Sequence, residues 1–203
     1  MRVSREKAAE NRERIVETAS RMFREGGLVG VGVDAIMNAA GLTHGGFYGH
    51  FESKENLVAE AVMRALERSV EGQGRYTNLS DLVSEYLSER HRADRANGCA
   101  LAALGADMVR QGKGVRRGLT VYVRQQLDRF ARLLANGTQA SRRKRAITTL
   151  AGMVGALTLA RAVDDPALSR EILAVARDGF GGSRPAERSR GRRARKAASA
   201  RKH

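Results

Sequence analysis

The sequence predicts an all-α protein, in which a small N-terminal helical unit precedes a larger one, with about nine helices in total. Apolar residues recur with a helical period along most of the 203 residues, and the alternation typical of strands is nearly absent. Residues that cap or end helices separate these periodic segments. With 42% hydrophobic residues, a chain of this length can bury a sizeable core.

The first predicted helix carries an apolar stripe and ends at Gly26-Gly27. Two short helical segments follow, at residues 33–40 and 44–51. The tight turn between them contains Gly41, which can adopt a positive φ at little cost. This arrangement is the layout of a helix-turn-helix. The stripe of the first helix consists of Ile15, Val16, Ala19, Met22 and Phe23.

A longer helix over about residues 53–72 comes next, and Ser53 can cap it, as Thr43 can cap the segment before it. Two glycines then break the chain. We therefore predict a helix-turn-helix domain over residues 1–52 and a second domain over residues 53–182, with the 53–72 helix linking them. The apolar face of this helix consists of Leu57, Val58, Ala61, Val62, Ala65 and Leu66.

The second unit contains five further helical segments. A capping Asn begins the segment at 78–87, an Asn-Gly pair opens the one at 97–108, and a longer helix spans 115–137. The segment at 146–163 is apolar on nearly every side, so we expect it to be buried on nearly every side. The last helix begins at an Asp-Pro pair and spans 165–179.

The net charge of +15 points to a polyanionic partner, with nucleic acid ahead of an anionic membrane surface. The surplus is uneven, since residues 183–203 hold nine Lys/Arg and one Glu. This tail lacks Leu, Ile, Val, Phe and Met, and we predict that it is disordered. It suits either a non-specific DNA or RNA arm or a solubilising extension, and composition leaves both open. Residues 1–57 hold eight basic and eight acidic residues.

Several protein classes are disfavoured by the composition and motifs. The first dozen residues are polar, unlike a signal peptide, and the longest uncharged apolar stretch, residues 146–160, is too short to span a bilayer. A single Cys builds no disulfide framework, so we expect a cytoplasmic protein with no membrane partner. The sequence has no nucleophile elbow, phosphate loop, dinucleotide fingerprint or zinc-protease motif, and its His and Cys residues lack metal-site spacing. We therefore expect no enzyme activity, no cofactor and no metal.

Residues 39–57, AAGLTHGGFYGHFESKENL, carry a much more specific pattern. They resemble the DNA-binding segment of the TetR family of transcriptional repressors, and the close resemblance covers about residues 8–68. The family pattern combines a Gly turn, a Thr or Ser, an aromatic-Tyr pair, His-Phe and a Ser-Lys-acidic run. The matching residues are Gly41, Thr43, Gly46, Phe47, Tyr48, His50, Phe51, Ser53, Lys54 and Glu55.

The resemblance implies that residues 33–40 form a supporting helix and residues 43–51 a recognition helix in the major groove. The residues implied to bind phosphates are Thr43, Tyr48, His50 and Lys54, and those implied to approach base edges are His44, Gly45 and Gly46. The residues implied to support this unit as its core are Val33, Ile36, Ala40, Gly41, Leu42, Phe47 and Phe51.

Residues 42–51 contain no Arg or Lys, so the usual bidentate Arg–guanine contact is not available from this segment. We hypothesise that readout uses His44, backbone approach at the glycines, the Thr43 methyl group and DNA shape. Other roles stay open for individual residues. Tyr48 can be a half-buried core residue, His50 can cap carbonyls, and Gly45-Gly46 can be plain turn residues.

The resemblance also implies that the second unit binds a small-molecule effector and dimerises. The helices at about 141–163 and 167–179 would pair with their twofold mates in a four-helix bundle. The alternative is an intramolecular core helix. Two recognition helices must meet half-sites about one helical turn apart, so DNA reading itself calls for a dimer. The expected interface residues are Leu150, Met153, Val154, Leu157, Leu168 and Ile172.

An effector pocket is expected among the middle helices, with Leu66, Tyr86, Met108, Tyr122 and Phe130 as its lining, although each also suits a plain core. His91 can be a polar pocket group, but its arginine neighbours favour a surface position. Cys99 lies near a helix N-terminus, where the dipole favours a thiolate. It is a candidate sensor of oxidants or electrophiles, and the alternative is a small buried hydrophobe.

The function predicted from these observations is a ligand-responsive transcriptional regulator. It would bind a palindromic DNA operator as a homodimer, act as a repressor and be released by a small-molecule inducer. The alternative is an architectural, sequence-independent DNA-binding protein that uses its basic tail.

Overall fold

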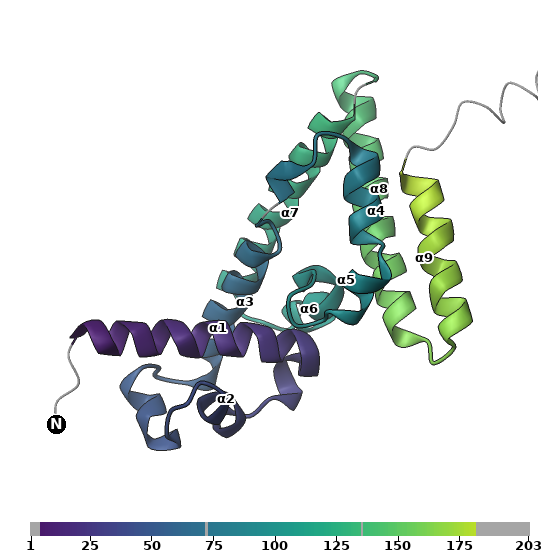
Figure 1. Ribbon diagram of the computed structural model, residues 1–203. Helices are drawn as coiled ribbons and strands as arrows, with labels where there is room; N and C mark the ends of the chain where they lie inside the picture. Colours follow the sequence, from purple (N-terminus) through teal and green to yellow (C-terminus); the bar gives the residue numbers. More distant parts are fainter. Residues whose placement is uncertain (1–4, 72, 135, 182–203) are drawn as a thin grey trace, which may run out of the picture.

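The computed structural model describes residues 5–71, 73–134 and 136–181, and the tail at 183–203, predicted to be disordered, lies outside them. Within the described ranges the chain forms nine α-helices and two 3₁₀ helices, with no strand (Figure 1). The predicted all-α class is confirmed. The elements are α1 (Arg5–Gly30), α2 (Val33–Ala39), η1 (His44–Gly49), α3 (Lys54–Arg68), η2 (Gln73–Arg75), α4 (Leu79–Tyr86), α5 (Glu89–Ala93), α6 (Ala100–Met108), α7 (Lys113–Leu133), α8 (Gln139–Ala162) and α9 (Pro166–Phe180).

The N-terminal unit consists of α1 lying across α2 and η1 (Figure 1). The chain leaves helical geometry at Gly27, where φ is 78°, and a further turn runs to Gly30. The end expected at Gly26-Gly27 is therefore a kink within a longer helix. Gly41 has a φ of 69°, so the predicted positive-φ turn is confirmed. The core of the unit contains Ile15, Val16, Ala19, Phe23, Ile36, Ala40, Phe47 and Phe51, with Val33 and Leu42 packed against it.

Helix α3 takes part in both predicted units. Its apolar side chains are buried, and it packs against α1 as well as against α6 and α7. One hydrophobic core therefore runs from the helix-turn-helix through α3 into α6 and the first half of α7. This continuous core crosses residue 52, where the sequence predicted a domain boundary.

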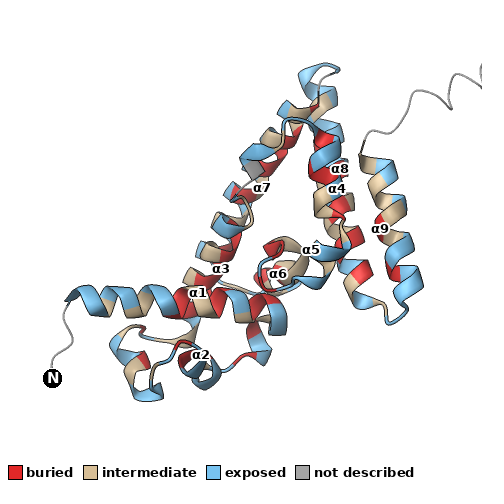
Figure 2. Ribbon diagram, viewed as in Figure 1, coloured by how far each residue is buried: buried red, intermediate tan, exposed pale blue. Residues whose placement is uncertain are grey.

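A second core joins α4, the second half of α7, α8 and α9. In Figure 1, α7 and α8 meet at one end and diverge toward α6, while α9 runs along α8. Figure 2 shows that α9 is mostly exposed or intermediate, and only Ser169 and Leu173 are buried in it. No helix in the described ranges is both long and apolar enough to cross a membrane.

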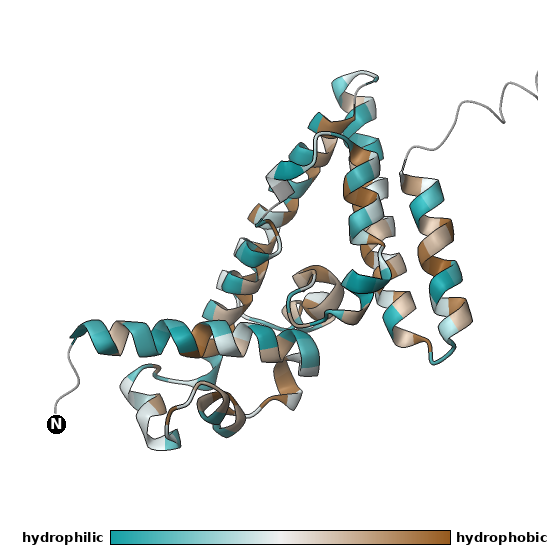
Figure 3. Cartoon of the chain, viewed as in Figure 1, coloured by the Kyte–Doolittle hydropathy of each residue, from teal (hydrophilic) through white to brown (hydrophobic). Residues whose placement is uncertain are grey.

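Helix α8 corrects one expectation. The 146–163 segment was expected to be buried on nearly every side, but Ile147 is 47% exposed and Leu159 is 57% exposed. One face of α8 instead packs inward through Met153 and Leu157, which are fully buried. Apolar residues also recur along α9 (Figure 3). Two of them, Leu168 and Val175, are exposed. The outer surfaces of α8 and α9 thus carry apolar side chains that the described part of the chain does not cover.

The predicted N-terminal caps are present at the starts of three helices and absent at one. The side chains of Ser53, Asn78 and Asp165 accept backbone hydrogen bonds at the starts of α3, α4 and α9. Thr43 occupies the cap position of η1, but its side chain makes no capping hydrogen bond. Helix α5 was not predicted, because five residues are too few to show a helical period.

Two glycine substitutions test the packing of α8 on α9. A Cβ on Gly152 would lie 2.0 Å from Cζ of Phe180, whereas a Cβ on Gly105 in α6 would meet nothing within 4 Å. Replacing an open helical Gly by Ala stabilises by about 0.5–1 kcal/mol, and overpacking costs about 1–3 kcal/mol. We expect Gly105→Ala to raise the free energy of unfolding and Gly152→Ala to lower it, in urea denaturation at one protein concentration. Equal stabilisation by both variants would contradict this packing.

Candidate nucleic-acid interface and effector cavity

The segment expected to be the recognition helix is short and tightly wound. The amide of Gly46 donates to the Thr43 carbonyl at 3.0 Å and that of His50 donates to the Phe47 carbonyl at 2.9 Å, so the turns are of the i to i+3 type. Residues 44–49 contain three glycines, and Gly is the poorest helix former after Pro. The segment is therefore a 3₁₀ helix rather than the predicted α-helix.

Two phenylalanines hold this segment against the core. Phe47 is 1% exposed, and its ring stacks on that of Phe51 at 5.6 Å between centroids. The Arg12 guanidinium of α1 lies 4.6 Å over the Phe51 ring on the other side. Tyr48 points outward and is 71% exposed, so the alternative of a half-buried core tyrosine is wrong.

The outward face of the turn and η1 presents the residues that the resemblance assigned to DNA. Thr43, His44 and Gly45 are exposed, as is Tyr48, and Gly46, His50 and Lys54 are half-buried. Hydroxyls, a lysine and an imidazole are thus available on one short stretch, and such groups commonly contact phosphates and base edges.

An acidic residue on α2 orients His44. The Nδ1 atom of His44 forms an ion pair with Oδ1 of Asp34, and both side chains are largely exposed. When the imidazole is neutral, Nδ1–H donates to the carboxylate, which leaves Nε2 as a hydrogen-bond acceptor. The sequence reasoning missed this role of Asp34, because an acidic residue at the start of a helix is ordinarily explained by the helix dipole.

A row of ion pairs joins α1 to α3. Arg12 donates to both carboxylate oxygens of Glu60 at 2.6 and 2.5 Å. Farther along α3, Arg64 pairs with Glu13 and lowers the pKa of that carboxyl. Arg68, at the end of α3, contacts Glu17 at 3.1 Å. These pairs define the position of α1 along α3.

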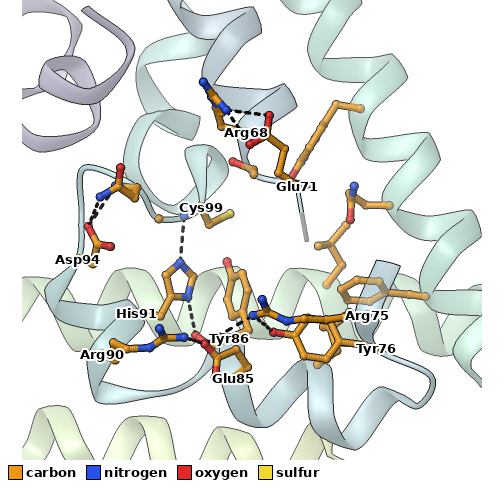
Figure 4. Close-up of a pocket in the computed structure, with 18 residues that line it drawn as sticks. Arg68, Glu71, Arg75, Tyr76, Glu85, Tyr86, Arg90, His91, Asp94 and Cys99 are labelled. Carbon is orange, nitrogen blue, oxygen red and sulfur yellow. Dashed lines mark hydrogen bonds and ion pairs between the residues drawn. The ribbon is translucent and has the colours of Figure 1, made fainter. Parts of the chain in front are cut away.

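The end of α3 also forms part of the wall of a cavity of about 230 Å³. The cavity lies between the end of α3, the η2–α4 segment, α5, the start of α6 and the middle of α7 (Figure 4). Gly98 belongs to this wall, and a Cβ there would lie 2.7 Å from the Asp94 carbonyl oxygen, so only glycine fits. The lining residues are Arg68, Ser69, Glu71, Arg75, Tyr76, Leu82, Glu85, Tyr86, Arg90, His91, Asp94, Asn97, Gly98, Cys99, Tyr122, Gln126, Phe130 and Leu150.

Three of the five expected pocket residues, Tyr86, Tyr122 and Phe130, line this cavity. Leu66 and Met108 do not, since both are buried in the core shared by α1, α3 and α6. Helical period identifies an apolar face, but it does not distinguish a core contact from a cavity wall. The charged lining residues were missed for a related reason, because charged side chains on short helices are ordinarily solvent-facing.

His91 lies in the wall, so the expectation of a surface residue is wrong. Its Nδ1 lies 2.7 Å from the Tyr86 carbonyl oxygen, and its Nε2 accepts the Cys99 amide at 3.0 Å (Figure 4). An acceptor at Nε2 requires the proton on Nδ1, so the ring is the neutral Nδ1–H tautomer. Burial lowers the pKa of His91, and the nearby Arg161 charge adds to the decrease.

The expected dimer residues divide into two groups. Met153 and Leu157 are fully buried within the chain and Leu150 lines the cavity, so the prediction that they form an outer interface is wrong. An apolar helix does not reveal from sequence which of its faces is internal. The remaining expected residues, Val154, Leu168 and Ile172, are half-buried or exposed.

Comparison with known proteins agrees with the N-terminal geometry. The family model described as "Bacterial regulatory proteins, tetR family" matches residues 15–61. The HTH-type transcriptional regulator AcrR of Shigella flexneri is 36% identical over 59 residues, which cover 29% of this chain and 27% of that relative. The HTH-type transcriptional repressor KstR2 of Mycolicibacterium smegmatis is 32% identical over 81 residues, or 40% and 38% of the two chains. The chain thus spans well under half of the length of these curated relatives.

Solved structures extend the similarity to the whole fold. A TetR transcriptional regulator from Chloroflexus aurantiacus aligns with a TM-score of 0.69 at 24% identity, covering 87% of this chain and 94% of that one. A TetR-family regulator from Cytophaga hutchinsonii aligns with a TM-score of 0.67 at 21% identity, covering 92% and 100%. At these identities the likeness shows the all-α fold alone.

The N-terminal unit is a helix-turn-helix of the kind found in bacterial regulatory proteins. Residues 15–61 therefore match the TetR family, and the similar proteins named above are transcriptional regulators.

The buried neutral state of His91 predicts a pH dependence of stability. The pKa of His91 is lowered in the fold from its ordinary value of 6.5, so below about pH 6.5 the unfolded chain takes up a proton that the folded chain does not. His91 therefore destabilises the fold as pH falls through this range and has no such effect above it. We expect His91→Gln to have a lower free energy of unfolding than the wild type near pH 8, measured by urea denaturation. The difference between the two proteins should be smaller near pH 5.5. A gap that is the same at both pH values would contradict the assignment.

Proposed function

We propose that this protein is a ligand-responsive transcriptional repressor that binds a palindromic DNA operator as a homodimer. The observation that carries the proposal is the surface of η1, where Thr43, His44 and Tyr48 project outward from a segment held in place by Phe47 and Phe51. A rigid support is what a base-reading segment needs, since side chains must meet base edges within hydrogen-bond distance.

The outer surface of α8 and α9 supports the homodimer. Ile147, Leu159, Leu168 and Val175 are all exposed there, between 41% and 66%. Exposed large apolar side chains on two adjacent helices can contribute to a protein–protein contact. A second copy placed on this surface would leave both η1 segments free for half-sites about 34–36 Å apart.

The cavity supports release by a small molecule. An occupant would touch Arg68 and Ser69 at the end of α3, and Ser69 Oγ accepts the Ala100 amide of α6 at 3.0 Å. Because α3 continues into the core of the helix-turn-helix, a ligand that shifts this end of α3 would change the spacing of the two η1 segments. The effect is a population shift between dimers that do and do not fit the operator. Transcription then resumes because the operator is no longer occupied.

Footprinting on DNA selected from a random pool tests the proposal against the architectural alternative. The full chain and a chain ending at residue 182 should both protect one discrete palindromic site. Removal of the nine Lys/Arg of residues 183–203 should weaken non-specific binding and flatten its salt dependence. Uniform protection that disappears with the tail would instead support the architectural protein.

The Asp34–His44 pair predicts which bases are read. With Nδ1–H held by Asp34, the neutral ring presents Nε2 as an acceptor, which suits the N4 amino group of cytosine or the N6 amino group of adenine. We expect His44→Ala to lose about 1 kcal/mol of preference at one position of each half-site. Asp34→Asn should weaken the base preference at that same position and at no other. The measurement is the affinity for operators that differ by single bases, near pH 8.

A matched control is Asp128→Asn, which removes an exposed carboxylate paired with Arg143 at 3.0 Å between α7 and α8, outside the N-terminal unit. This variant should bind every operator variant as the wild type does. If Asp34→Asn and Asp128→Asn gave the same base preferences, Asp34 would have no part in readout.

A further inference from the structure

The charged residues of the cavity wall already have partners within the chain. Arg68 contacts both carboxylate oxygens of Glu71 at 2.8 and 3.1 Å. Glu85 pairs with Arg90 and lies 4.0 Å from Arg75 (Figure 4). These pairs are largely exposed, so each contributes only about 0–1 kcal/mol. They nevertheless leave no unpaired charge among them to offset the dehydration of a charged ligand, and that dehydration is unfavourable.

The remaining charged and ionisable groups of the wall are also occupied. Oδ1 of Asp94 accepts from the backbone and side-chain nitrogens of Asn97 at 3.2 and 2.9 Å. His91 uses both ring nitrogens and is neutral, as described above. Burial raises the pKa of both Tyr86 and Tyr122, so these hydroxyls also stay uncharged. The wall therefore offers no net charge to a ligand.

One polar atom in the wall lacks a strong partner. The hydroxyl of Tyr86 is buried and finds no oxygen or nitrogen partner within the described part of the chain, and its neighbour there, the Cys99 thiol, is a weak one. Leaving a buried hydroxyl unsatisfied costs about 1–3 kcal/mol, and His91, which packs edge-on against the Tyr86 ring at 4.7 Å, cannot help because its nitrogens are used. A ligand that supplies an acceptor atom would recover this energy.

The size and composition of the cavity limit the rest of the ligand. Phe130, Leu82 and Leu150 provide apolar walls, and Tyr86 and Tyr122 provide ring faces and edges. The volume of about 230 Å³ is below the range of about 300–1,000 Å³ that holds drug-sized ligands, and apolar cavities near 150 Å³ hold a single benzene. One aromatic ring with a short substituent therefore fits.

We infer that the effector is a small, uncharged aromatic compound with a carbonyl or similar acceptor, and that the Tyr86 hydroxyl donates to that acceptor. The inference rests on the proposed function, in which the cavity is the effector site. A ligand bound this way lies beside Ser69, whose contact with Ala100 joins α3 to α6, so binding acts on the helix that continues into the DNA-binding unit.

Four probes with a single aromatic ring test the inference on the full chain: methyl benzoate, benzoate, benzylamine and toluene. In calorimetric titration near pH 7.5 we expect methyl benzoate to bind most tightly. Benzoate and benzylamine should bind at least about tenfold more weakly because they bring a charge, and toluene about fivefold to tenfold more weakly because it lacks the acceptor. Methyl benzoate should also lower the affinity for the selected operator.

Two variants that each remove one hydroxyl separate the hydrogen bond from the packing. Tyr86→Phe should weaken the binding of methyl benzoate by about fivefold to tenfold and leave the binding of toluene unchanged. Thr120→Val is the control, since the Thr120 hydroxyl is exposed on α7, lies outside the cavity wall and donates to the Arg116 carbonyl oxygen at 2.9 Å. It should bind both probes as the wild type does.

The outcomes separate this inference from the proposed function. Equal or tighter binding of a charged probe, or unchanged ester binding by Tyr86→Phe, would overturn the ligand class. If the protein protects a discrete operator but binds none of the probes up to millimolar concentration, the inference fails and the repressor stands. If the ester binds as expected but no discrete operator exists, the ligand class is supported and the proposed regulatory function fails.

Discussion

Six apolar side chains of α3 are buried against α1, α6 and α7, and the placement of both functional regions follows from that burial. A fully buried Leu or Val contributes about 1.5–3 kcal/mol, so α3 does not shift without carrying its neighbours along. One end of the helix begins beside η1 at Lys54, and the other ends at Arg68 in the cavity wall. Helix α3 thus connects the N-terminal unit to the cavity wall, and the packing of α6 on α1 provides a second connection.

The polar contacts around α3 have a different role from its apolar ones. Exposed ion pairs contribute only about 0–1 kcal/mol each, so the pairs of Arg64 and Arg68 with α1 do not hold the fold together. They favour one register of α1 on α3, which sets where η1 lies. Within the described part of the chain, Nε and Nη1 of Arg24 on α1 are buried without a hydrogen-bond partner, and burial lowers the pKa of the guanidinium. Burying a cation with unsatisfied donors is unfavourable, so Arg24 lowers the stability that the apolar stripe of α1 provides.

Much of this arrangement could be predicted from local chemistry. Ser53, Asn78 and Asp165 cap helices because their side chains reach backbone amides two or three residues on, and Gly41 adopts a positive φ that other residues avoid. The predictions that were wrong concern features that depend on tertiary packing. The sequence could not tell that Met153 faces inward while Leu159 faces outward, because both lie on a helix that is apolar all round. Nor could it place His91 in a cavity, because the burial of a residue among arginines depends on how α5 packs against α8.

The charge of the N-terminal unit is better understood from where its charged residues lie than from their sum. Residues 1–57 carry as many acidic as basic residues, which by itself argues against attraction to DNA. Yet Glu13 and Glu17 are paired with Arg64 and Arg68, and Arg64 lies ten residues, about 15 Å of helix, beyond Lys54. Those acidic side chains are thus neutralised far from η1. Asp34 contacts the outward face of η1 through its pair with His44, whereas Glu52 and Glu55 on either side of Lys54 are exposed. The pairing of Glu13, Glu17 and Asp34 therefore reduces, without removing, the acidic charge that this unit presents to phosphates.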